Sequence, residues 1–160
     1  MAVYLSTSCY GRRPLIEAIE LCKRITHDKI EISAPHDFQP LEETAEILKK
    51  YNDEGINFTL HNYFPAPEKS FVLNMASNDA TINKLSHELV KNALHLAKIS
   101  NAPLYGIHAG YLSKARADDS GSFIFEEEEE KYDKALMRAV KFITKISNEF
   151  EKEKINFIIE

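Results

Sequence analysis

The sequence predicts an α/β fold built on a parallel sheet, and three observations lead to that class. Short apolar runs alternate with segments of helical spacing along all 160 residues. The runs at 56–61, 104–108 and 155–160 are typical of parallel strands that are buried on both faces. Each of these runs ends on a residue that can bind a metal ion, and ligands gather at the carboxyl ends of parallel strands. We therefore expect a ligand site at one edge of the sheet.

The first half of the chain predicts two strands and two helices. Pro14 suits the first turn of a helix, where no backbone donor is needed. The second helix carries glutamates in its first turn and lysines in its last, which suits the helix dipole, and Gly55 is placed to end it. We expect these elements at 3–5, 14–27, 29–33 and 41–51.

The second half continues the alternation. A loop over 62–78 is long for a compact domain, and such loops are usually functional. Ser77 or Asn78 is expected to cap the helix that follows. A second polar loop precedes the acidic run at 126–130, which we interpret as the solvated start of the last helix. The expected strands lie at 56–61, 104–108 and 155–160, and the expected helices at 79–100 and 132–149.

The β-α order admits two closures of the sheet. One is an open doubly wound sheet, and the other is part of an eight-stranded barrel, which has about 250 residues when complete. The sequence has no Gly-rich phosphate loop after its first strand, and its last apolar run is a bare strand without a covering helix. Both features favour a single (β/α) barrel domain over 1–160 that is truncated after strand five.

Composition narrows the function classes. The hydrophobic share of 44% and the charged share of 28% are those of a globular domain. The net charge of −5 weighs against a large nucleic-acid or anionic-membrane surface. Cys9 and Cys22 are too few for a disulfide framework and favour a reducing compartment. We expect no signal peptide and no membrane span, and therefore a cytoplasmic protein.

The three strand-end residues form a candidate metal site. His61, His108 and Glu160 would meet at neighbouring strand ends, which lie about 5 Å apart in a sheet. Histidine nitrogens suit zinc, manganese, cobalt or iron, and a carboxylate can bridge two ions. The alternative for any one histidine is a structural residue held by hydrogen bonds.

Other residues near the expected strand ends could contact a substrate. Glu31 lies within a strand, where a carboxylate is costly to bury unless it is paired. It could act in catalysis at the barrel mouth or form a structural pair. His87 and His95 fall inside a helix and are expected at the surface or its boundary. The candidate substrate-binding residues are Tyr10, His36, Asn62, Tyr63 and Tyr111.

Three segments carry a resemblance to a known family. The stretches Leu60–Pro65, Leu73–Ser77 and Gly106–Gly110 resemble the xylose isomerase-like barrel superfamily. That superfamily contains sugar isomerases, sugar phosphate isomerase/epimerase-type proteins and the endonuclease IV type of abasic-site nuclease. The resemblance spans nearly the whole chain and implies strands one to five of a TIM-barrel type fold.

The resemblance also implies roles for the strand-end residues. His61 and His108 match two histidines that hold zinc in the nuclease branch. Glu160 matches a strand-five glutamate that binds metal in both the nuclease branch and the isomerase branch. Strands six to eight, which bring further ligands in the family, are absent from the sequence. The resemblance therefore implies an incomplete site, with Glu160 and Glu31 left to move protons.

Three functions remain open at this stage. The first is an isomerase or epimerase that acts on a sugar or sugar phosphate with a divalent metal, most readily zinc or manganese. The second is an abasic-site nuclease, which the acidic charge balance opposes because phosphate contacts dominate DNA affinity. The third is a non-catalytic half-barrel that pairs with a partner, such as a second copy, through its exposed edge.

Overall fold

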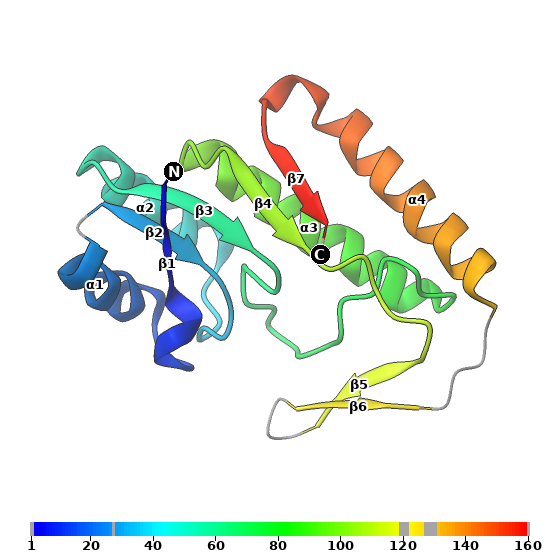
Figure 1. The fold of residues 1–160 in the computed structure, drawn as a ribbon. Helices are drawn as coiled ribbons and strands as arrows, with labels where there is room; N and C mark the ends of the chain where they lie inside the picture. Colours follow the sequence, from blue (N-terminus) through cyan, green and yellow to red (C-terminus); the bar gives the residue numbers. More distant parts are fainter. Residues whose placement is uncertain (1, 27, 119–121, 127–130, 160) are drawn as a thin grey trace.

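The fold is built on a five-stranded parallel sheet (Figure 1). The computed structural model describes residues 2–26, 28–118, 122–126 and 131–159. The sheet order is β1-β2-β3-β4-β7, and every neighbouring pair is parallel. The expected α/β class is therefore confirmed. Its strands are β1 (Leu5–Ser6), β2 (Lys29–Ile32), β3 (Asn57–His61), β4 (Leu104–Ile107) and β7 (Asn156–Ile159).

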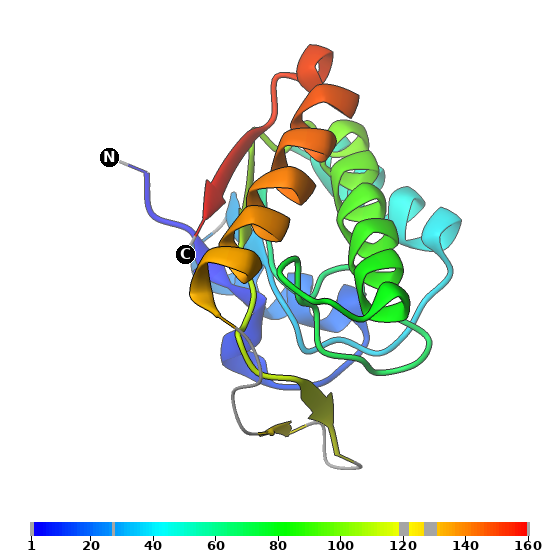
Figure 2. The ribbon, with the colours of Figure 1, turned by 90° about the vertical axis from the view of Figure 1, so that its right-hand side faces the viewer.

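Four long helices connect the strands, and Figure 2 shows α3 and α4 side by side along the sheet. Each helix has an apolar stripe that packs on the sheet, as helical spacing requires. The shorter turns η1 (Thr7–Tyr10) and η2 (Glu151–Glu153) are 3₁₀ helices. The long helices are α1 (Leu15–Thr26), α2 (Leu41–Asp53), α3 (Ala80–Ile99) and α4 (Tyr132–Glu149).

The strands present different residues to their two faces because side chains alternate along a strand. The face under the helices is apolar and carries buried residues such as Ile30, Phe58 and Tyr105. The opposite face is polar, and Glu31 and His61 lie on it, half-buried. This alternation differs from the expected burial on both faces. It gives the sheet one packed face and one face whose polar groups are available for a site.

The last strand lies at an edge of the sheet. The register pairs Ile107 of β4 with Ile159 of β7. Ile158 and Ile159 are 43% and 51% exposed, respectively. Their exposure follows from the edge position, because within the described part of the chain β7 pairs with β4 alone. Glu160, the next residue, lies outside the described residues.

Most boundaries lie within two residues of the expected ones, and two of the differences have local reasons. The first strand is Leu5–Ser6 instead of 3–5, and the Ser6 hydroxyl accepts a hydrogen bond from the Ser8 amide that starts η1. The cap of α3 is Asp79, not Ser77 or Asn78. Its Oδ1 accepts from the amides of Thr81 and Ile82 at 2.7 and 3.2 Å, as an N-cap carboxylate does.

The second polar loop contains an unexpected hairpin, β5 (Ala115–Ala117) and β6 (Phe123–Phe125). The two strands pair antiparallel, and Figure 1 shows them beyond the carboxyl ends of the main strands. Each strand has three residues, too few for a clear period of two. Glu126 is exposed, and the rest of the acidic run, 127–130, lies outside the described residues.

Among the described residues, no helix has the length and apolar character needed to cross a membrane.

Candidate functional site at the carboxyl edge of the sheet

The structure brings His61 and His108 together. His61 is the last residue of β3, and His108 directly follows β4. These strands are neighbours in the sheet, so their carboxyl ends share one edge. The two imidazole ring centroids lie 5.7 Å apart, with an angle of 79° between the ring planes.

Gly106 makes room for the His61 ring. It is the register partner of His61 on β4, and its hydrogen occupies the place of a side chain. A Cβ atom at this position would lie 2.8 Å from Cδ2 of His61, closer than real contacts allow. On the other side, the Ser33 hydroxyl lies 3.4 Å from Nδ1 of His61. Groups of this kind set the orientation of a ligating imidazole.

The separation of the two histidine rings can be compared with that of two ligands of a single transition-metal ion. With metal–nitrogen bonds of about 2.0–2.1 Å, two imidazoles on one tetrahedral ion have centroids roughly 5 Å apart. The observed 5.7 Å is close to this separation. Among the described residues, no cluster of three or more His, Cys, Asp or Glu side chains forms a metal site. The expected third ligand, Glu160, lies outside them, so the three-residue set stays a prediction.

Glu31 lies on the same face of the sheet as His61. The register pairs Glu31 with Ser6 on one side and Thr59 on the other. Thr59 is two residues before His61, a rise of about 7 Å along the strand. The carboxylate is half-buried. It therefore lies deeper along the polar face than the histidines, and its catalytic role stays a prediction.

Tyr63 and Tyr111 lie together beneath the β5–β6 hairpin. The Tyr63 ring packs on Phe123 at 5.3 Å between centroids, and the Tyr111 ring packs on Phe125 at 5.0 Å. Burial, followed by the proximity of Tyr111, raises the pKa of the Tyr63 hydroxyl. Both tyrosines thus present an apolar ring with a polar tip at the loop ends that follow β3 and β4.

His36 is held between the loops that follow β1 and β2. It is 4% exposed, and its Nε2 lies 3.0 Å from Oγ1 of Thr7. The Thr7 hydroxyl also donates to the carbonyl of Ser33 and accepts from its amide, both at 2.9 Å. Burial lowers the pKa of His36. These contacts give His36 a structural role, and a substrate contact stays a prediction.

The remaining two candidates shape the loops. Asn62 is buried, and its Oδ1 accepts from the amide of Tyr63, which adopts a left-handed φ of 60°. The Tyr10 hydroxyl donates to the carbonyl of Leu21 on α1 at 3.5 Å. The structure therefore does not join Tyr10 to the histidine pair.

Asn74 is a residue of the site that sequence reasoning did not single out. Its Oδ1 accepts from the amides of Ala76 and Tyr111 at 3.0 and 3.1 Å, and its Nδ2 donates to the carbonyl of Tyr111 at 3.0 Å. Gly110 has a φ of 128°, and a Cβ there would collide with Oδ1 of Asn74. Asn74 thus ties the loop after β3 to the loop after β4.

The fold and the edge site define a (β/α) barrel-type domain with a histidine pair at its carboxyl edge. Comparison with protein families identifies the same class: the model of the xylose isomerase-like TIM barrel family matches residues 15–160. The chain belongs to this family, which confirms the resemblance carried by the sequence. No match was found among curated protein sequences.

Several solved structures are similar in fold to this chain. A D-tagatose 3-epimerase-like protein matches with a TM-score of 0.70 and 18% identity, over 99% of this chain and 52% of that one. A D-psicose 3-epimerase determined in the presence of D-fructose matches with a TM-score of 0.65 and 19% identity, over 99% and 52%. The TTHB071 protein from Thermus thermophilus, soaked with ZnCl₂, matches with a TM-score of 0.58 and 16% identity. The match covers 93% of this chain and 54% of that one. The chain therefore spans about half the length of these proteins.

Replacing Asn74 with alanine should destabilise the protein. The change leaves the buried amide of Ala76 and both backbone groups of Tyr111 without their partner, which we expect to lower the free energy of unfolding by about 2–3 kcal/mol. Urea unfolding measures this change in the free energy of unfolding. The exposed Asn78→Ala serves as the control, with an expected change within about 0.5 kcal/mol. Equal effects of the two substitutions would contradict this role of Asn74.

The buried His36 should make stability depend on pH. Its pKa is lowered in the folded state from the ordinary value of 6.5, so the unfolded state binds the proton more readily. The stability contributed by neutral His36 is complete above pH 6.5 and is lost as the pH falls through the folded-state pKa. Between pH 7 and 5, unfolding curves should show that the free energy of unfolding falls less steeply with pH in His36→Gln than in the parent. His95→Gln, at an exposed histidine of α3, should follow the parent; a His36→Gln variant that also follows it would refute the idea.

Proposed function

We propose that this chain forms part of a divalent-metal-dependent isomerase or epimerase that acts on a sugar or sugar phosphate. The observation that carries the proposal is the His61–His108 pair, with ring centroids 5.7 Å apart at the carboxyl edge. Ligand sites of (β/α) barrels form at this edge. Family membership and the epimerase names of two structural neighbours support the substrate class.

In this proposal His61, His108 and Glu160 hold the ion. A bound divalent ion would polarise adjacent oxygens of a hydroxy-carbonyl substrate. Glu160 and Glu31 are the proposed carboxylates that move the proton. Glu31 is suited to this by its place on the polar face, beside Ser6 and Thr59.

The aromatic residues under the hairpin have a proposed role in excluding water. Tyr63 and Tyr111 pack on Phe123 and Phe125, which places apolar surface over the loops at the site. Excluding water from a site strengthens the electrostatic interactions within it and limits side reactions. In this proposal these tyrosines also contact the sugar, together with His36 and Asn62.

A specific observation keeps a second function in view. A pair of strand-end histidines matches the zinc ligands that the resemblance assigns to the abasic-site nuclease branch. The net charge of −5 opposes a large DNA-binding surface. The third alternative is a non-catalytic half-barrel that forms a homodimer, and the exposed edge strand β7 supports it.

For the compartment we propose the cytoplasm, in keeping with the two free cysteines.

Metal content and turnover test the proposal together. We expect about one transition-metal ion per chain in the parent and none in a His61→Ala/His108→Ala double variant, because that variant removes two of the proposed ligands. His95→Ala, an exposed histidine, is the matched control and should retain the metal. The full-length reading frame should then interconvert members of a panel of ketoses and ketose phosphates with added manganese or zinc.

The same preparation separates the alternatives. Metal retention by the double variant, or full-length protein without turnover on the panel, would count against the isomerase proposal. Salt-sensitive binding and cleavage of an abasic duplex would favour the nuclease. A metal-free chain that sediments as a dimer would favour the half-barrel assembly.

A further inference from the structure

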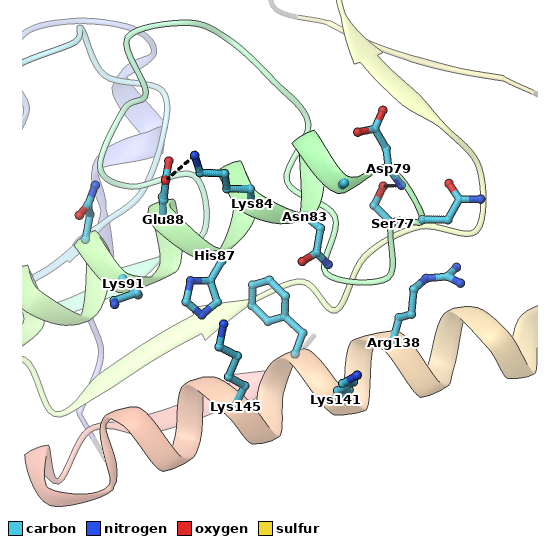
Figure 3. A pocket seen from close by; sticks show the side chains of 14 residues that line it. Ser77, Asp79, Asn83, Lys84, His87, Glu88, Lys91, Arg138, Lys141 and Lys145 are labelled. Atoms are coloured by element: carbon cyan, nitrogen blue, oxygen red, sulfur yellow. Dashed lines mark hydrogen bonds and ion pairs between the residues drawn. The ribbon is translucent and has the colours of Figure 1, made fainter.

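A wide groove runs between α3 and α4 on the outer helical layer (Figure 3). Its volume is about 980 Å³, at the upper end of the range of small-molecule sites. The groove is lined by both helices and by the segment before α3, and its floor includes the buried Phe142. None of the metal-site candidates lines it, so it is separate from the site at the carboxyl edge.

Two basic stripes line this groove. On α3 the stripe is Lys84, His87 and Lys91, and on α4 it is Arg138, Lys141 and Lys145. Both follow the spacing i, i+3 and i+7, which places the side chains of each stripe on one face of its helix. Seven residues of helix rise about 10 Å, so each stripe extends over that length.

The charge of the groove is opposite to that of the whole chain. Five lysine and arginine residues line it against two acidic residues, whereas the chain carries a net charge of −5. Of the two acids, Asp79 caps α3, and Glu88 lies 3.8 Å from Lys84. A third acid beside the lining, Glu149, lies 3.4 Å from Lys91. Within the described part of the chain, neither Lys141 nor Lys145 forms an ion pair. These two lysines thus add positive charge to the groove without matching acids.

The side chain of His87 lies among charged groups from both helices of this groove. Its ring packs edge-on against Phe142 at 5.6 Å between centroids, and its Nε2 lies 3.4 Å from Oε1 of Glu149. Burial and the charges of Lys145 and Lys91 lower the pKa of His87, while Glu149 opposes the shift. Cations from both helices therefore act on the His87 ring. An anion bound in the groove would act on the same ring.

We propose that the groove between α3 and α4 binds a small organic or inorganic anion that carries two or more phosphate groups. Two facing stripes about 10 Å long suit several linked charges better than a single one. A long polyanion such as nucleic acid would extend beyond the groove over a chain whose net charge is −5. A compact anion stays within about one Debye length, roughly 8–10 Å, of the groove cations. This proposal goes beyond the proposed function and does not depend on a metal.

Calorimetric titration with tripolyphosphate and with ATP tests the proposal. The chain is first freed of metal with a chelator that is then removed, because phosphate chains themselves bind divalent ions. At low ionic strength we expect saturable one-to-one binding. We also expect the NMR-detected pKa of His87 to rise, since a nearby negative charge favours the protonated ring. Binding of both ligands assigns recognition to the phosphate chain, and binding of ATP alone assigns part of it to the nucleoside.

The matched variants are Lys141→Gln/Lys145→Gln and Lys134→Gln/Lys152→Gln. The first pair removes two groove cations, and the second removes two exposed lysines outside the groove lining. Glutamine keeps the helix propensity of lysine, so the fold should persist. We expect the groove pair to weaken affinity by roughly tenfold or more and the control pair to change it little. Equal weakening by both pairs, an unmoved His87 pKa, or binding of a single-stranded oligonucleotide without binding of either phosphate ligand would overturn the proposal.

Discussion

The register between β3 and β4 is the constraint on which the candidate site depends. It places Gly106 beside His61, and the missing side chain leaves the space that the imidazole occupies. A shift of one residue would turn His61 toward the helices, because side chains alternate between the two faces. The buried residues Leu60 and Tyr105, paired in the same register, fix it by packing under the helices. The core therefore sets the geometry of the edge.

The loops at that edge are tied to one another by buried polar groups. Asn74 joins the loops after β3 and β4, and Thr7 joins His36 and Ser33 after β1 and β2. A buried polar group is costly without its partner, so each of these contacts favours one arrangement of the loops. The hairpin adds Phe123 to this assembly through Tyr63. Short strands thus support a site whose walls are mostly loop residues.

The sequence alone predicted the parts of this molecule that local patterns determine. Apolar runs and helical spacing predicted the sheet and its helices, and strand-end position predicted that His61 and His108 would meet. The role of Asn74 depends on Tyr111, which lies 37 residues away, and no local pattern shows that pairing. The hairpin strands are too short for a period to emerge. The partners of His36 likewise depend on Thr7, 29 residues earlier in the chain.

X-ray absorption of the zinc-loaded chain, beside a Gly106→Ala variant, tests the central claim most directly. In the parent we expect two imidazole nitrogens at about 2.0–2.1 Å from one zinc ion. In the variant a methyl group would displace the His61 ring, and we expect zinc affinity to fall roughly tenfold or more although both histidines remain. A zinc site without histidine nitrogens, or a variant that binds zinc as the parent does, would contradict the account.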